Sequence, residues 1–162
     1  MKKGFGKVFS ALAVMTAGAA AGGVAANSVA AKKIQQLTDG HKKVHELYMA
    51  FDQWLRIRQQ GKTLAAYFER NNYKTVAIYG MKELGERLCD ELKDSGIDVR
   101  YGIDQNADSI YADVDVITPD DDLEPVDVIV VTAIYYFDEI EEMLSEKVEY
   151  PVISLEDILY EV

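Results

Sequence analysis

Cysteine is nearly absent from this chain of 162 residues, which carries a single thiol at Cys89. One cysteine cannot form an internal disulfide, so the sequence gives no sign of an oxidising compartment. His41 and His45 have the helical spacing of a pair of metal ligands, but no cysteine follows them at the spacing of a further ligand. The positive charges of Lys42 and Lys43 beside them also disfavour a bound cation. The sequence therefore predicts no metal site.

Basic side chains are scarce in residues 63–162, which hold 7 Lys or Arg against 25 Asp or Glu, a balance of −18. Residues 1–62 hold 10 basic and 3 acidic residues, a balance of +7, within a net charge of −11. Affinity for nucleic acid comes largely from neutralising phosphates, so we expect no nucleic-acid partner for the acidic region. The basic region flanks an apolar stretch and suggests an anionic membrane surface.

Charge is absent altogether from residues 8–31, a stretch of 24 residues that is long enough to cross a bilayer. Gly18 and Gly22 have the spacing that lets two membrane helices approach closely. Three interpretations stay open: a single-pass membrane anchor, a signal peptide cleaved near Ala26 or Ala30, and an amphipathic or disordered tail. The leading prediction is an anchor in the cell membrane with the C-terminal domain in the cytoplasm, because seven Lys or Arg follow the stretch closely.

A strongly helical pattern follows at residues 41–60, and a second short helix is expected after Gly61. The first helix has one wide apolar face, which must be buried either against the chain's own sheet or in a homo-oligomer through the Val44–Leu55 helix. We expect its aromatic residues to be core rather than a ligand cage. The face consists of Val44, Leu47, Tyr48, Phe51, Trp54 and Leu55.

Residues 74–106 have the pattern of the opening unit of a nucleotide-binding α/β domain: a strand, a glycine turn, a helix, and a second strand that ends in an acid. Gly80 and Gly85 match the first and third glycines of the G-x-G-x-x-G fingerprint, and Asp104 lies near the position of the acid that holds ribose hydroxyls. The turn would aim backbone N–H groups at a phosphate. Lys82 replaces the middle glycine, where it either obstructs a dinucleotide or supplies a cation.

Three more strands are expected at residues 114–117, 126–132 and 151–154, with helices from near Asp138 and over 155–162. Residues 118–123 are expected to form a turn or a brief helix. The aspartates 120–122 fit the start of a helix after Pro119 better than a metal site, because acids are favoured near a helix N-terminus. The fold prediction is a small doubly wound parallel sheet of about five strands with helical crossovers, which binds ligands at the carboxyl ends of its strands.

The chain therefore divides into an apolar segment at 1–33, a helical segment at 34–72 and a Rossmann-like nucleotide-binding domain at 73–162. No residue is assigned a catalytic role. The sequence does not identify a cofactor and leaves a nucleotide-sugar and an NAD-type nucleotide open. The predicted binding residues are Gly80, Met81, Lys82, Gly85, Asp104, Thr132 and Tyr135.

Several motifs carry a resemblance: Asp52-Gln-Trp-Leu, Ala77-Ile-Tyr-Gly-Met, Ile103-Asp-Gln-Asn and Pro151-Val-Ile-Ser-Leu-Glu-Asp. Over about residues 44–162 the chain resembles a group of small clostridial-type Rossmann-domain proteins that recur around surface-polysaccharide genes. The α/β part is also similar to the nucleotide-sugar-binding domain that precedes the catalytic domain of some bacterial sugar-modifying acetyltransferases. The resemblance implies a nucleotide-sugar or related nucleotide at the Gly80 turn and Asp104.

The leading hypothesis is a membrane-tethered accessory protein that binds a nucleotide or nucleotide-sugar for surface polysaccharide biosynthesis. The alternative is a Rossmann-like scaffold that has lost the ligand and holds a partner through the Phe51 and Trp54 face. A third hypothesis is an NAD-dependent sugar-nucleotide epimerase or reductase. Against it, the sequence has no Tyr-x-x-x-Lys, the acid/base pair typical of short-chain enzymes, and its α/β part leaves no room for a second substrate domain.

Overall fold

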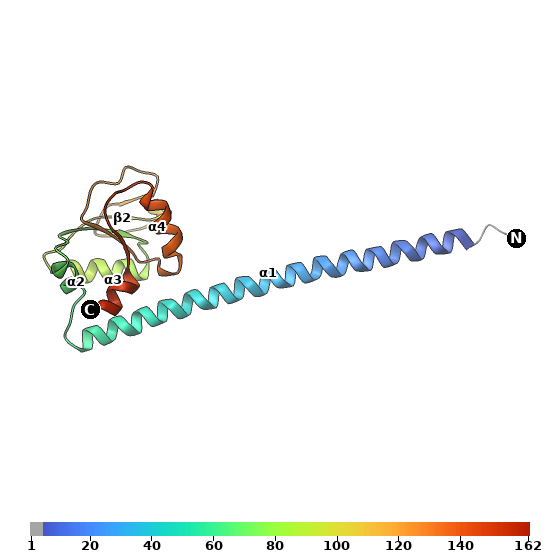
Figure 1. Cartoon of the computed structure of the whole chain (residues 1–162), viewed down its shortest axis with the longest axis horizontal. Coiled ribbons are helices and arrows are strands. Elements are labelled where there is room, and N and C mark those ends of the chain that lie inside the picture. The colour runs from blue at the N-terminus through green and yellow to red at the C-terminus, as the bar shows by residue number, and fades with distance from the viewer. Residues whose placement is uncertain (1–4) are drawn as a thin grey trace. The chain divides into compact units, whose positions relative to one another are not determined.

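The computed structural model describes the backbone of residues 5–162 and the side chains of residues 31–162. The chain divides into two compact units, residues 1–44 and residues 45–162. Helix α1 (Phe5–Gln59) provides residues to both units (Figure 1). The predicted membrane anchor lies, except for Ala31, outside the residues whose side chains are described. Within residues 31–162, whose side chains the structure describes, no helix is long and apolar enough to span a bilayer.

A five-stranded, all-parallel sheet forms the centre of the second unit, as the sequence predicted. The order of the strands is β3-β2-β1-β4-β5. The chain moves outward from β1 to β3 and then returns to the other side of β1, so the switch point lies between the carboxyl ends of β1 and β4. The strands are β1 (Thr75–Tyr79), β2 (Asp98–Ile103), β3 (Val116–Ile117), β4 (Val128–Val131) and β5 (Val152–Ser154).

Helices cover both faces of this sheet (Figure 1). One face is covered by the end of α1, α2 (Ala65–Arg70), α3 (Glu83–Leu92) and α5 (Leu155–Glu161), and the other by α4 (Phe137–Ser145). Side chains of β1 alternate between the two cores: Val76 and Ile78 pack under α3, and Ala77 and Tyr79 pack on the α4 side. Both cores are apolar, which accounts for the continuous apolar run in the sequence of this strand.

Two of the predicted helical crossovers are wrong. Strand β2 leads to β3 through a short 3-10 helix, η1 (Ala107–Ser109), and no helix stands between β3 and β4. Residues 118–123 form the turn rather than the brief helix, the two alternatives expected there. In it the Asp121 carboxylate accepts hydrogen bonds from the backbone N–H and the hydroxyl of Thr118, each at 2.8 Å.

The apolar face predicted for residues 44–55, which belong to α1, is only partly buried. Trp54 is a core residue, as expected, but Val44, Tyr48 and Leu55 are 67%, 63% and 56% exposed. The buried face of α1 is rotated from the predicted one, and it follows Ala50, Trp54 and Ile57 at helical spacing. Packing against the chain's own sheet therefore accounts for only part of the predicted apolar face. A homo-oligomer formed through the remaining exposed residues stays a prediction.

Candidate functional site

The turn after β1 is closed against the end of β4. Gly80 has a φ of +94°, in the region that glycine favours. A Cβ atom on Gly80 would lie 2.9 Å from the Thr132 hydroxyl oxygen and 3.1 Å from the backbone nitrogen of Ala133. Thr132 is buried, and its hydroxyl donates a hydrogen bond to the Gly80 carbonyl. A side chain at position 80 would therefore collide with the end of β4, so only glycine fits at this point of the turn.

Gly85 brings helix α3 directly onto this turn. A Cβ atom at Gly85 would lie 2.3 Å from the Gly80 carbonyl oxygen, a distance that no side chain tolerates. This close approach of helix and turn is the role expected of the third glycine in the fingerprint. Gly80 and Gly85, the two glycines that match the fingerprint, thus have the roles in the turn and in helix packing that the motif predicts.

Asp104 follows β2 and is 7% exposed. Its Oδ2 accepts a hydrogen bond from the Met81 N–H at 3.1 Å, and its Oδ1 accepts one from the Asn106 N–H at 2.9 Å. The carboxylate therefore ties the glycine turn to the loop after β2. The Met81 N–H, which belongs to the turn expected to face a phosphate, points instead at this side chain.

The Met81 side chain is buried in the core, with 2% exposed. It lies over Gly102 of β2, where an added Cβ would approach the Met81 Cγ to 2.6 Å. Sequence reasoning missed this partnership. Glycine inside a strand was the available signal, because it often marks a place where another group approaches the backbone closely.

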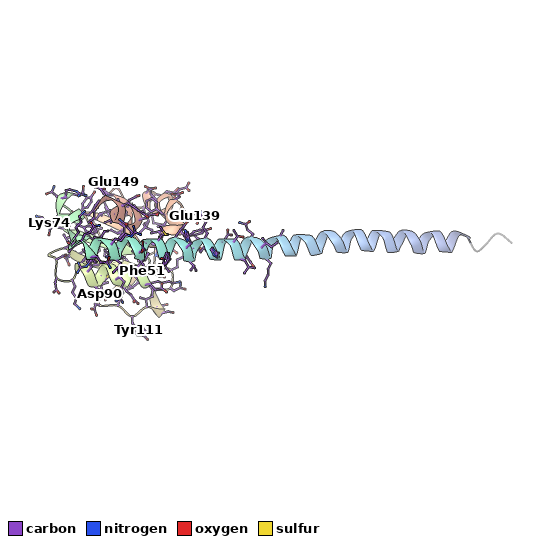
Figure 2. All side chains as sticks on the ribbon, turned by 90° about the horizontal axis from the view of Figure 1, so that it is seen from below. Phe51, Lys74, Asp90, Tyr111, Glu139 and Glu149 are labelled. Carbon is purple, nitrogen blue, oxygen red and sulfur yellow. The ribbon has the colours of Figure 1, made fainter. Side chains whose placement is uncertain are left out.

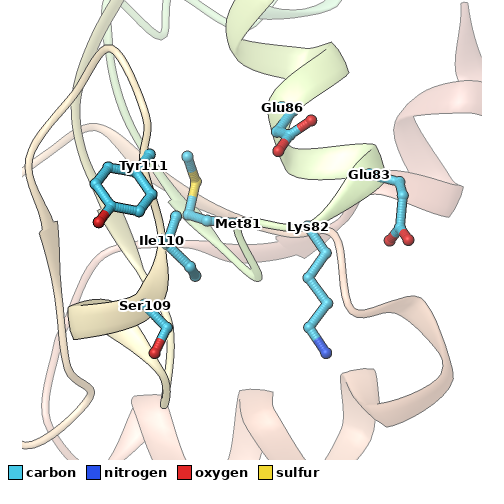
Figure 3. Close-up of a pocket in the computed structure, with 7 residues that line it drawn as sticks. All are labelled: Met81, Lys82, Glu83, Glu86, Ser109, Ile110 and Tyr111. Carbon is cyan, nitrogen blue, oxygen red and sulfur yellow. The ribbon is translucent and has the colours of Figure 1, made fainter.

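A hollow of about 410 Å³ opens beside the turn, a volume within the range of small-molecule sites (Figure 3). Two segments line it: the turn with the first turn of α3, and the end of η1 with the residues after it. Figure 3 shows Met81 between Lys82 on one side and Tyr111 on the other. The lining residues are Met81, Lys82, Glu83, Glu86, Ser109, Ile110 and Tyr111.

This lining combines an aromatic ring, a cation and two carboxylates. Tyr111 is 96% exposed and stands out at the edge of the second unit (Figure 2). Lys82 is the residue before α3, and no side chain caps the first N–H groups of that helix. Such a helix start attracts anions, whereas Glu83 and Glu86 accept hydrogen bonds from hydroxyl or amine donors. The hollow suits a ligand that carries both an anionic group and hydrogen-bond donors.

The predicted site residues fall into three places. Gly80, Gly85 and Thr132 meet at the switch point. Asp104 lies on the β2 side of the same turn, where it accepts the Met81 N–H. Lys82 lies at the hollow. Tyr135 does not line it, and lies in the 3-10 helix η2 (Ile134–Tyr136) after β4, where its ring meets that of Tyr136 edge to face with centroids 5.1 Å apart.

Sequence reasoning missed the second wall of the hollow, formed by Ser109, Ile110 and Tyr111. Residues 104–115 have neither strand nor helix periodicity, so no pattern placed this loop beside α3. The one signal was an aromatic residue among acids, at Tyr111. An ion pair between Lys93 and Asp113, with nitrogen and oxygen 2.8 Å apart, connects the loop to the end of α3, and this hydrogen bond lowers the pKa of Asp113.

Two titratable groups near the site have pKa values raised by burial. The pKa of Cys89 on α3 rises to about 11, so the thiol is protonated at neutral pH and is a poor nucleophile. The pKa of Tyr79, at the end of β1, also lies above its ordinary value. In residues 31–162, the described side chains form no group of three or more His, Cys, Asp or Glu that could hold a metal ion.

Comparisons of the chain with protein-family models, with curated proteins and with solved structures gave no match. The functional conclusion therefore depends on the geometry and chemistry of the switch point and the hollow.

Proposed function

We propose that this chain is a membrane-tethered accessory protein that binds a nucleotide-sugar in the hollow beside the Gly80 turn. The observation that carries the proposal is the meeting of three chemistries around one hollow of about 410 Å³: the uncapped start of α3 with Lys82, the exposed ring of Tyr111, and two carboxylates.

Each chemistry matches one part of a nucleotide-sugar. The diphosphate fits the start of α3, where backbone N–H groups and the Lys82 ammonium attract negative charge. The base fits the Tyr111 ring, since every base has a π-face that stacks on an aromatic side chain. The sugar hydroxyls fit Glu83 and Glu86, whose carboxylates accept hydrogen bonds. A ligand made only of phosphates would be repelled by these two acids.

Asp104 has a positioning role in this proposal. Its carboxylate holds the Met81 N–H on one wall and the Asn106 N–H at the start of the loop that forms the other wall. Fixing both segments sets the width of the hollow. Ribose binding by Asp104, expected from the fingerprint, is a separate proposal, because each carboxylate oxygen already accepts one backbone hydrogen bond.

The place of the chain in surface polysaccharide biosynthesis rests on its resemblance to proteins around such genes. Nucleotide-sugars are the activated donors from which such polymers are made. A binding domain tethered at the cytoplasmic face of the membrane would hold the donor beside membrane enzymes, without a reaction of its own.

Isothermal calorimetry on the full chain in detergent micelles tests the proposal, with UDP-sugars, GDP-sugars, NAD and coenzyme A as separate titrants. We expect one nucleotide-sugar class to bind. Lys82→Ala and Tyr111→Ala should weaken that binding, whereas Lys74→Ala and Tyr160→Ala, which remove exposed side chains outside the hollow, should not. Equal affinity in all four variants would contradict the proposed site.

A second candidate is a scaffold that keeps the fold without a ligand. The observation in its favour is that the chain satisfies the switch point by itself, through Asp104 on the Met81 N–H and Thr132 on the Gly80 carbonyl. No heat of binding with any titrant, from a chain that is folded by circular dichroism, would favour this candidate.

A further inference from the structure

The part of α1 over residues 31–44 carries a concentration of positive charge. Lys32, Lys33, Lys42 and Lys43 stand against one acid, Asp39, within 14 residues of the first unit. This segment directly follows the uncharged stretch at 8–31. Lysines in such a position are attracted to the anionic lipids of a membrane surface.

The same segment is amphipathic. At about 100° per residue, Ile34, Leu37 and Val44 fall within an arc of about 80° on one side of the helix, and His41 is the one polar residue inside this arc. They are 64%, 65% and 67% exposed, so nothing in the described structure covers them. Lys32 and Lys43 lie on the opposite side. An exposed apolar face opposite a basic face is the pattern of helices that lie in the headgroup region of a bilayer.

A second copy of the chain is a weaker fit to this apolar face. A coiled coil needs apolar residues at heptad spacing over about three or four heptads. The heptad spacing that starts at Ile34 ends at Phe51, because that side chain packs against the core of its own unit. The remaining seam is about two heptads long, and it does not use the lysines.

We propose that residues 31–44 bind an anionic membrane surface as a basic amphipathic helix, with Ile34, Leu37 and Val44 facing the acyl chains. Lys33 borders the apolar side, where its long stem lets the ammonium reach the headgroups. The proposal rests on the membrane tether of the proposed function and is independent of the ligand at the hollow. It makes that tether a surface one, because α1 is continuous from Phe5 to Gln59 and a helix that crossed the bilayer at residues 8–31 would carry residues 31–44 away from its surface.

The test uses the full chain with an environment-sensitive fluorophore at position 37, introduced by Leu37→Cys in a Cys89→Ser background. We expect a blue shift on vesicles that contain phosphatidylglycerol, a much smaller shift on pure phosphatidylcholine, and reversal by high salt. Gln36→Cys is the matched control, because it lies about 100° round the helix on the polar side and should show little shift.

The lysines are tested with Lys42→Gln/Lys43→Gln. The ratio of vesicle-bound to free labelled protein should fall by about 25-fold, which is about fivefold for each lysine removed. Lys74→Gln/Arg100→Gln removes the same charge from exposed positions in the second unit and should leave the shift unchanged. Calorimetry with the nucleotide-sugar should be the same for both double variants, which separates failure of this proposal from failure of the ligand site.

Two results would overturn the proposal. Equal shifts on neutral and anionic vesicles, unaffected by the lysine variant, would mean that the lysines have no part in membrane contact. A blue shift that appears without vesicles and grows with protein concentration would mean that a second copy covers the apolar face.

Discussion

The Asp104 carboxylate and the Met81 backbone nitrogen lie 3.1 Å apart, and this contact joins the loop after β2 to the turn after β1. The two segments are separate in the sequence, yet they border the same hollow. The contact shows how a Rossmann-like sheet holds a glycine turn in shape without a ligand. It also makes Asp104 the residue on which the turn and the hollow both depend.

Asp104→Ala should destabilise the second unit. The change leaves the N–H groups of Met81 and Asn106 without their carboxylate acceptor, and we expect a loss of about 2 kcal/mol or more in the free energy of unfolding. Urea unfolding followed by circular dichroism measures it. A loss below about 0.5 kcal/mol, the size expected at an ordinary surface position, would contradict the positioning role.

Gly85→Ala should destabilise the unit through overpacking. The new methyl group would meet the Gly80 carbonyl oxygen at 2.3 Å, and separating helix from turn should cost about 1 to 3 kcal/mol. Gly40→Ala is the matched control, because nothing lies within 4 Å of its added Cβ and alanine is the better helix former. If both variants unfold at the same urea concentration as the wild type, the close packing at Gly85 is not a constraint.

Glu91→Ala should release the end of α1 from the core. Glu91 accepts hydrogen bonds from the Trp54 ring nitrogen and from the Leu64 N–H, each at 2.6 Å. Losing an acceptor for two part-buried donors should cost about 2 kcal/mol or more. The emission of Trp54, the one tryptophan of the chain, should shift to longer wavelength as water reaches the ring.

Asp90→Ala, on the same helix, is the control for this change. Its ion pair with Arg87 is exposed, so its loss should be worth less than about 1 kcal/mol. An unchanged Trp54 emission in Glu91→Ala would show that α1 is held in place without this carboxylate.

Stability should fall in acid partly through Asp127. Hydrogen bonds from the backbone N–H groups of Lys74 and Thr75 hold the pKa of Asp127 below its ordinary value of 3.8. Because the folded pKa is the lower one, this stabilisation is complete well above pH 3.8 and is lost as the pH falls through the folded pKa. Urea unfolding as a function of pH should show a shallower acid dependence in Asp127→Asn. Identical profiles would contradict the assignment.

The sheet could be predicted because its signals are local. The apolar run of β1 and the spacing of Leu84, Leu88 and Leu92 each specify an element without knowledge of the rest of the chain. The failures concern a loop and a helix face. The aspartates after Pro119 lie in a turn, and the buried face of α1 includes Ala50, whose small side chain did not count as an apolar anchor.

The candidate site also has features that local sequence predicts and features that depend on packing. Gly80 and Gly85 could be predicted from the chemistry of one turn. The contact of Asp104 with Met81 depends on two strands lying side by side, and the position of Tyr111 depends on a loop without periodicity. Such relationships follow from the packing of the sheet, which a single sequence does not display.

The central claim is that the hollow beside the Gly80 turn binds a nucleotide-sugar. The most direct measurement is a titration of the ¹⁵N-labelled full chain in micelles with the nucleotide-sugar panel, following the backbone amide resonances. The account predicts shifts concentrated at Glu83, Leu84 and Gly85 and in the loop around Tyr111. Shifts confined to Thr132 and Tyr135, or none with any nucleotide-sugar, would contradict it.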